Sequence, residues 1–170
     1  MELQHAFVER ISKTKALEIA DHVMEHPRHL PTLVQYFMGD DYRSCQNAAW
    51  VLSTIGEKQP LLLEHYVGAF IDHLDSTPID GVKRNILRLL EYQEIPESHQ
   101  GKLVEYCFQY LTDQKEAIAV QAFSMSVLAN LCQLYPDLKH ELRLIIEDLM
   151  QFGSAAIRAR GRRVLKQIEK

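Results

Sequence analysis

Two histidines and a glutamate near the N-terminus have the spacing of a metallopeptidase motif. His22, Glu25 and His26 form the pattern His-x-x-Glu-His, which is the order of the inverted zinc-peptidase motif. Histidines four residues apart share a helix face, as two ligands of one Zn²⁺ ion must. The motif also needs a third ligand and an α/β context, and His26 precedes Pro27, which disfavours helical backbone. We therefore predict no metal site and interpret the pair as helix C-terminal residues, which the helix dipole favours.

No other group of residues predicts catalysis. The three cysteines, Cys45, Cys107 and Cys132, have unrelated spacings and no Cys-x-x-Cys pattern, which is typical of reduced helix residues. The chain has no glycine-rich phosphate loop, and no Ser/His/Asp or Cys/His arrangement is supported beyond the residue types being present. The sequence predicts a protein that is not an enzyme and that uses no cofactor.

Charge is distributed unevenly along the 170 residues. The formal net charge is −4, but from Ser154 onward there are six basic residues and one acidic residue. That segment carries +5, which leaves −9 for the remainder, and an acidic balance disfavours binding of a bulk polyanion such as nucleic acid. The first residues contain no signal-peptide core, and no apolar run is long enough to span a membrane. We expect a cytoplasmic protein.

A repeated helical segment organises the whole chain. The copies begin at Ser44, Val82, Val120 and Ile157, so the period is 38, 38 and 37 residues. When the first residue of each copy is numbered zero, position eight is Leu52, Leu90, Leu128 and Leu165. A fixed period of this length is the sequence signature of a repeat architecture. A degenerate copy begins at Ser12.

The sequence therefore predicts an all-α chain made of about five helical hairpins. No long segment alternates with period two, and proline follows the second helix of four pairs, where a helix must stop. The predicted helices cover 2–11, 12–26, 30–38, 44–55, 61–74, 82–93, 99–111, 116–134, 137–152 and 154–170, with Ser154 as an N-cap. The predicted hairpins are 2–27, 28–60, 61–96, 97–136 and 137–170, within one repeat domain.

This repeat resembles the HEAT-repeat family. The second helix of that family runs Val-Arg-x-x-Ala-Ala-x-Ala-Leu-x-x-Ile, and Ile157, Arg158, Val164, Leu165 and Ile168 match it in the last copy. The resemblance implies a right-handed α-α superhelix, with the related armadillo class as the alternative. It also implies a protein-binding scaffold whose second helices line a concave surface. Cys45 and Gln121 stand where the family has a basic residue.

The outward positions of the second helices contain the candidate binding residues. They are Trp50, Arg84, Arg88, Tyr92, Phe123, Arg160, Arg163 and Lys166. An exposed Trp beside Arg is the composition of a binding hot spot, and Ala122, Ser126 and Ala129 form the predicted floor of the surface. Its N-terminal end is acidic and its C-terminal end basic, so we predict a protein or peptide partner with a charged extended segment.

Three other interpretations stay open at this stage. Trp50 is also explained as a side chain that packs against its neighbours, and the arginines beside it as a solvated helix face. The C-terminal arginines are also explained as the polar cap of a solenoid. Some alkylpurine DNA glycosylases have HEAT-like repeats with aromatic and arginine residues in a basic groove, and Trp50, Arg84, Arg88 and Arg163 are similar. The single Trp and the acidic net charge argue against that enzyme. For a lyase-like repeat protein we find no residue set.

Overall fold

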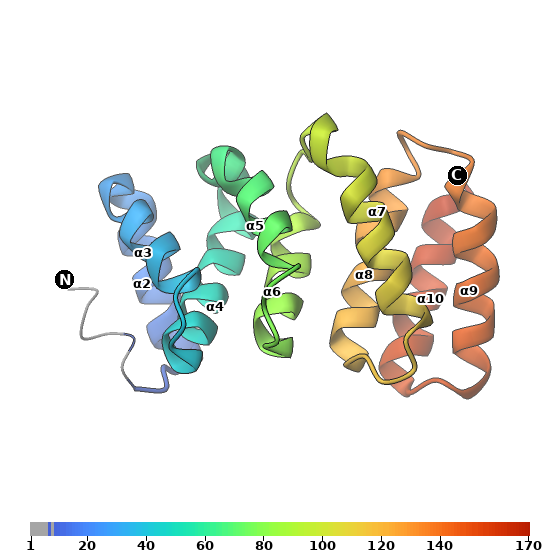
Figure 1. The fold of residues 1–170 in the computed structure, drawn as a ribbon, viewed down its shortest axis with the longest axis horizontal. Helices are drawn as coiled ribbons and strands as arrows, with labels where there is room; N and C mark the ends of the chain where they lie inside the picture. The colour runs from blue at the N-terminus through green and yellow to red at the C-terminus, as the bar shows by residue number, and fades with distance from the viewer. Residues whose placement is uncertain (1–6, 8) are drawn as a thin grey trace. The chain divides into compact units, whose positions relative to one another are not determined.

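The computed structural model describes Phe7 and residues 9–170, and over these residues it is helical without any β-strand (Figure 1). The chain divides into two compact units, Met1–Ile95 and Pro96–Lys170. The all-α prediction is confirmed, and within each unit the helices are paired as the repeat predicts. No helix in the described part of the chain is long and apolar enough to cross a membrane.

The first unit contains three second helices and the segments that pack beside them. Helix α4 packs against α2 and α6, which are the equivalent helices of the neighbouring repeats, and against α3 of its own hairpin. The elements are α2 (Lys13–Glu25), η1 (Pro27–His29), α3 (Leu30–Phe37), α4 (Tyr42–Lys58), η2 (Pro60–Tyr66), α5 (Val67–His73) and α6 (Asp80–Leu90), where η denotes a 3₁₀-helix.

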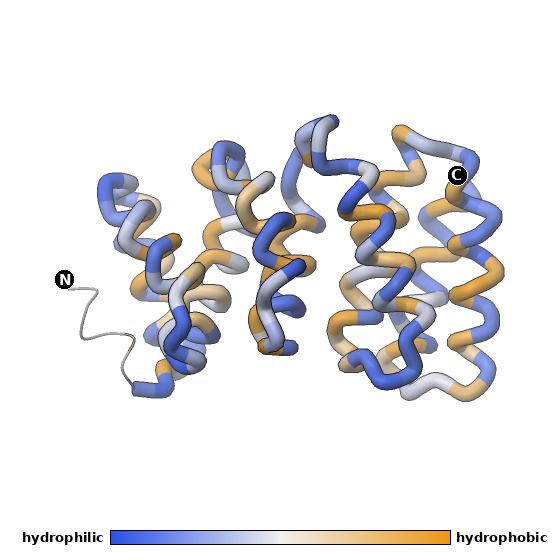
Figure 2. Tube along the Cα trace, in the orientation of Figure 1, coloured by the Kyte–Doolittle hydropathy of each residue, from blue (hydrophilic) through white to orange (hydrophobic). Residues whose placement is uncertain are grey.

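The second unit contains two helical hairpins. Its helices are α7 (Glu97–Thr112), α8 (Ile118–Leu131), α9 (Leu138–Phe152) and α10 (Ala155–Ile168). Helix α8 packs against α7 and α10, and α10 also packs against α9. The second helices of the two hairpins therefore touch each other directly. Hydrophilic and hydrophobic residues recur in turn along α9 (Figure 2), as a helix with one buried face requires, whereas most residues of α8 are buried.

Side-chain caps begin several of these helices. The carboxylate of Asp41 accepts a hydrogen bond of 2.8 Å from the backbone N–H of Ser44, and this bond lowers the pKa of Asp41. Ser12 caps α2 and Ser154 caps α10 in the same way, with distances of 3.1 and 3.3 Å. Such caps satisfy backbone donors that have no partner within the helix. The predicted N-cap at Ser154 is confirmed.

The repeat register is visible in the burial of its leucines. At position eight, Leu52 and Leu128 are fully buried and Leu90 is 2% exposed. Leu165 is only half-buried, because α10 packs against α8 and α9 and no further described helix covers its other side. Val164, one residue earlier, is fully buried. Three leucines thus occupy equivalent depths, and the fourth lies at the edge of its unit.

A glycine allows α9 and α10 to approach closely. A Cβ atom at Gly161 would lie 2.6 Å from Sδ of Met150 and 3.0 Å from Cγ2 of Ile146. Those distances are too short for nonbonded contact, so a larger residue would require the Met150 and Ile146 side chains to shift. The glycine within the basic run Arg-Ala-Arg-Gly-Arg-Arg therefore has a packing role.

The structure corrects two sequence predictions about local elements. Part of the helix expected at 2–11 lies outside the described residues, and Phe7 and residues 9–11 are not helical. The helix expected at 61–74 is divided between η2 and α5. Pro27 and Pro60 each begin a 3₁₀-helix, because the missing N–H of proline costs no hydrogen bond at a helix start.

Candidate functional site

Equivalent residues of α8 and α10 are joined in a row across the second unit. The guanidinium of Arg160 lies 4.8 Å from the ring centroid of Phe123. Arg163 donates to the hydroxyl of Ser126 at 3.2 Å, and Gln167 donates to Asn130 at 3.0 Å. Each pair is separated by 37 residues, which is the period of the repeat here. We call these six residues the α8–α10 ladder.

Two arginines of the ladder meet at one oxygen atom. Nη1 of Arg160 donates to Oγ of Ser126 at 2.6 Å, and Nη2 of Arg163 donates to the same atom. Ser126 is 5% exposed, whereas Arg163 is exposed. Phe123 supports the Arg160 guanidinium from below as a cation–π partner. The ladder therefore holds two guanidinium groups close together at the surface.

The ladder contains no carboxylate. Helix α8 has no charged residue at all, and α10 contains five basic residues and no acidic one. Lys166 is exposed one helical turn after Arg163. Glu169, just after α10, pairs instead with Arg143 of α9, with 3.4 Å between Nη1 and Oε1. The face formed by α8 and α10 is consequently positive.

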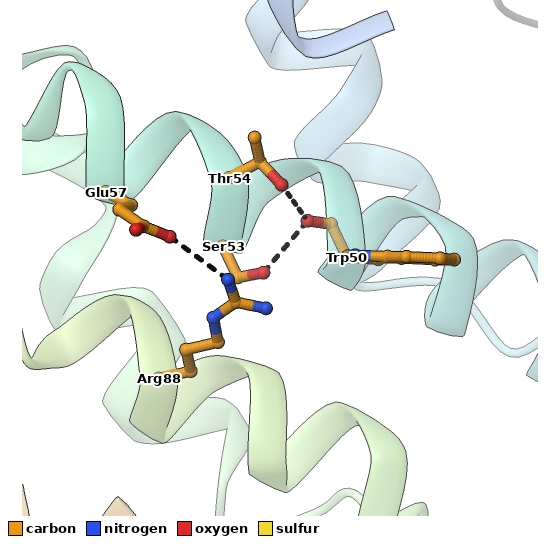
Figure 3. A network of polar contacts seen from close by, with 5 residues as sticks. All are labelled: Trp50, Ser53, Thr54, Glu57 and Arg88. Carbon is orange, nitrogen blue, oxygen red and sulfur yellow. Dashed lines mark hydrogen bonds and ion pairs between the residues drawn. The ribbon is translucent and has the colours of Figure 1, made fainter. Parts of the chain in front are cut away.

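In the first unit, the arginine equivalent to Arg163 has a charged partner. Arg88 occupies the same repeat position as Arg163, but its Nη2 forms an ion pair of 3.0 Å with Glu57 of α4. In Figure 3 the Arg88 side chain points to Glu57, and the Trp50 indole extends away from both. The backbone carbonyl of Trp50 accepts hydrogen bonds from Ser53 and Thr54 at 2.9 and 3.0 Å. The side chains of Trp50 and Arg88 thus point in different directions and do not form one site (Figure 3).

The remaining candidates of the first unit are accessible. Arg84 is exposed and Tyr92 is 42% exposed, whereas Trp50 is half-buried. Lys58 of α4 pairs with Asp21 of α2 at 2.7 Å. Lys58 and Arg88 therefore each meet a carboxylate of the preceding second helix.

The predicted floor of small residues is buried instead of exposed. Ala122, Ser126 and Ala129 are 8%, 5% and 1% exposed, and Asn47 of α4 is 6% exposed. The sequence pattern of a single helix does not show the contact between successive second helices, and this contact covers these positions. Asn47 donates instead to the backbone carbonyls of Phe7 and Glu9 at 3.1 and 2.8 Å.

Sequence reasoning does not find the hydrogen bonds of Ser126 or the pair Asn130–Gln167. The sequence predicts Ser126 as part of the floor, and in the structure its hydroxyl accepts hydrogen bonds from both arginines. A signal for these contacts does exist in the chain. In α8 and α10, residues at the same repeat position face one another, so a long donor and a short acceptor 37 residues apart are paired there, whereas Arg88 of α6 pairs with Glu57, 31 residues earlier.

Three histidines cluster where α2 meets η1. Ring centroids of His22 and His26 are 4.6 Å apart, and those of His22 and His29 are 5.3 Å apart. Loss of solvation, followed by the charges of His26 and His29, lowers the pKa of His22. Among the described residues, no three His, Cys, Asp or Glu side chains are grouped as ligands of a metal ion. The rings pack against one another in place of converging on one point.

A surface depression of the second unit has a mostly apolar lining. It measures about 520 Å³ and lies between α7 and the turn after α8. Its lining is Gly101, Val104, Leu134, Tyr135, Pro136, Asp137 and Leu138. One carboxylate among apolar groups provides neither a general acid–base pair nor an activated nucleophile.

Comparison with known proteins agrees with this architecture. No curated protein and no solved structure matches the chain. The family model of the HEAT repeat domain matches residues 3–168. Such domains are helical repeat scaffolds that usually mediate protein interactions, and the family is generally non-enzymatic. The match covers nearly the whole chain, and we conclude that this protein belongs to the HEAT repeat domain family.

Proposed function

We propose that the protein is a non-enzymatic scaffold that binds an acidic, extended segment of a protein partner. The main contact is the face formed by Phe123, Arg160, Arg163 and Lys166. One observation carries this proposal: Arg88 pairs with a carboxylate, whereas Arg163 at the same repeat position contacts only a neutral hydroxyl among the described residues. A cation without a counter-charge is available to an anionic partner.

The first unit contributes a secondary contact in this proposal. Trp50, Arg84 and Tyr92 offer an aromatic surface and one exposed cation. Arg88 contributes less, because Glu57 already neutralises its charge at 3.0 Å. Aromatic and arginine side chains are the commonest hot spots of protein interfaces. The partner accordingly combines acidic residues for the second unit with apolar groups for the first.

Affinity capture with charge-reversed variants tests the proposal. We expect Arg163→Glu to reduce recovery of a specific partner from native lysate by about tenfold or more, as loss of a hot-spot residue does. Arg162→Glu is the matched control, because Arg162 is exposed on the same helix and lies outside the ladder. Mass spectrometry measures the recovery, and circular dichroism verifies that both variants keep their helices.

The outcome is decided by comparing the variants. Equal loss in Arg163→Glu and Arg162→Glu would mean that general charge, and not the ladder, attracts the partner. If the double variant Arg163→Glu, Phe123→Ala still recovered the partner in full, this face would not be the binding site. A second double variant, Trp50→Ala with Arg84→Glu, measures the contribution of the first unit in the same assay.

A further inference from the structure

We infer that the surface between α7 and α9 binds a basic, apolar segment of a protein partner. Two depressions lie between these helices, and we call them together the α7–α9 groove. The segment that fits this groove has Leu, Ile or Phe side chains flanked by Lys or Arg. The groove contains no residue of the α8–α10 ladder, so the inference goes beyond the proposed function and does not depend on it.

The groove exists because α7 and α9 both pack against α8 and make much less contact with each other. The first depression, of about 520 Å³, lies between Gly101 and Val104 of α7 and the turn that leads to Leu138 of α9. A hydrogen bond of 2.5 Å from the Tyr135 hydroxyl to Oε1 of Gln100 ties that turn to α7. The second depression measures about 320 Å³, and its lining is Leu111, Thr112, Gln114, Leu144, Ile145, Asp148 and Leu149.

Large apolar side chains are exposed along this groove. Leu134 of the turn is exposed, Leu144 is 53% exposed, and Phe152 at the end of α9 is 93% exposed. Phe152 follows Asp148 by four residues, so both lie on the same side of the helix. Single exposed apolar residues are ordinary, but several along one surface are typical of a protein interaction site. The apolar groups of the groove therefore suit apolar side chains of a partner.

The charges of the groove decide which partner it binds. The residues that line the two depressions include Asp137 and Asp148 but no Lys or Arg. Glu141 lies between these aspartates on the same side of α9. None of the three carboxylates has an ion pair or a hydrogen bond within the described part of the chain. Carboxylates without a counter-charge attract a cationic segment and repel an acidic segment or a nucleic acid.

The spacing of the aspartates indicates the form of the segment. Asp137 and Asp148 are eleven residues apart, which is about 16 Å along a helix axis. An extended chain covers that distance in about five residues, so cations five positions apart reach both carboxylates. The two separate depressions suit individual side chains of such a chain better than the continuous face of a helix. We therefore infer an extended segment with apolar residues between its two cations.

Interferometry with three immobilised peptide libraries tests the chemistry of the segment. The first library has Lys at two positions five residues apart and Leu, Ile or Phe between them. In the second library Glu replaces Lys, and in the third Ser replaces the apolar residues. We expect the full chain to bind the first library at least about tenfold more tightly than the others, because each of those lacks one kind of contact. Equal binding of the first two libraries, or no binding of the first, would overturn the inference.

Charge reversal on α9 tests the location of the site. Asp148→Lys should weaken binding of the first library by about fivefold or more, because an attractive pair becomes a repulsive one. Glu147→Lys is the matched control, since Glu147 is exposed on the same helix and lines neither depression. The control should leave the affinity nearly unchanged. Equal loss in both variants would mean that general charge attracts the peptide, and the groove would not be the site.

Leu144→Ser tests the apolar contact and the alternative occupant. Because Leu144 is exposed, we expect the variant to keep its circular dichroism spectrum and to bind the first library about fivefold more weakly. Sedimentation of the unmodified chain is the second measurement. A dimer that Leu144→Ser converts to a monomer would overturn the inference in favour of a second copy of this chain in the groove.

Arg163→Glu separates this inference from the proposed function. Arg163 belongs to the α8–α10 ladder, so its reversal should leave binding of the first library unchanged. If Arg163→Glu weakened that binding as much as Asp148→Lys, the α7–α9 groove would not be the site. Partner capture that depends on Arg163 is a different measurement, and its result bears only on the proposed function.

Discussion

A single glycine shows how local packing overrides helix propensity in this chain. Gly161 lies inside α10, where glycine costs about 1 kcal/mol relative to alanine. A Cβ atom there would approach Met150 and Ile146 at 2.6 and 3.0 Å. Overpacking of this kind costs about 1–3 kcal/mol. The packing term is the larger one, so the helix keeps its glycine and α9 stays close to α10.

Two glycine substitutions are therefore expected to have opposite effects. Gly161→Ala should lower the free energy of unfolding by about 1 kcal/mol, because the clash exceeds the propensity gain. Gly101→Ala, in the exposed part of α7 with no neighbour within 4 Å, should raise it by about 0.5–1 kcal/mol. Urea denaturation followed by circular dichroism measures both. A stabilised Gly161→Ala variant would contradict the close approach.

At the residue scale, charge was the least predictable property. The sequence places Arg88 and Arg163 at the same repeat position and so treats them alike. Their difference depends on the residue that faces them from the preceding helix, which is Glu57 in one case and Ser126 in the other. Which residue faces each arginine depends on side-chain rotamers and on how far the two helices are shifted along each other. The repeat period determines neither.

At the element scale, the second helices carry both the core and the candidate site. Position seven is buried in all four copies, at Val51, Leu89, Val127 and Val164, each no more than 1% exposed. Each fully buried leucine or valine contributes about 1.5–3 kcal/mol through burial. Position eight follows the same rule except at the edge, where Leu165 is half-buried.

Aspartate substitutions at position eight should separate interior helices from the edge helix. Leu128→Asp buries an unpaired carboxylate and should lower the free energy of unfolding by about 4 kcal/mol or more. Leu165→Asp should cost about 1–2 kcal/mol, because its side chain keeps access to water. The measurement is the midpoint of chemical denaturation. Equal losses in both variants would show that the two positions are not distinguished by depth.

Helix identity was predictable from sequence, and helix ends were less so. The 38-residue period located α4, α6, α8 and α10, since apolar residues that recur at one helix face must be buried. The division of 61–74 into η2 and α5 was missed, because one apolar run is compatible with either helix type. The five predicted hairpin boundaries stay a prediction. The burial of Ala122, Ser126 and Ala129 was not predictable from the helical periodicity, because that periodicity describes one helix and not the helix beside it.

At the scale of the whole molecule, the chain divides into two compact units, and each contains buried apolar residues. The first includes Phe37 and Phe70, whose ring centroids are 5.2 Å apart. The second is built around Leu103, Leu128, Leu142 and Val164, which are fully buried. The first unit has a net charge of −5 and the second +1, which follows from their Lys, Arg, Asp and Glu content. The two units thus differ in the sign of their net charge.

A fragment of residues 96–170 should fold by itself. It contains two complete hairpins and a fully buried core, and it is longer than the roughly 40 residues below which domains need disulfides or metals. We expect a helical circular dichroism spectrum and a cooperative urea transition. A fragment that remains unfolded in buffer would show that the second core alone is insufficient.

If the face formed by α8 and α10 binds the partner as proposed, the cross-helix contacts of Arg160 and Arg163 with Ser126 make recognition a property of a junction and not of a single repeat. Half of the ladder is encoded in one hairpin and half in the next. Duplication of either hairpin would therefore copy the fold without copying the specificity, and insertion of a repeat between them would erase it. To transfer this binding specificity to another repeat protein, both adjacent hairpins, α7–α8 and α9–α10, have to be transferred together.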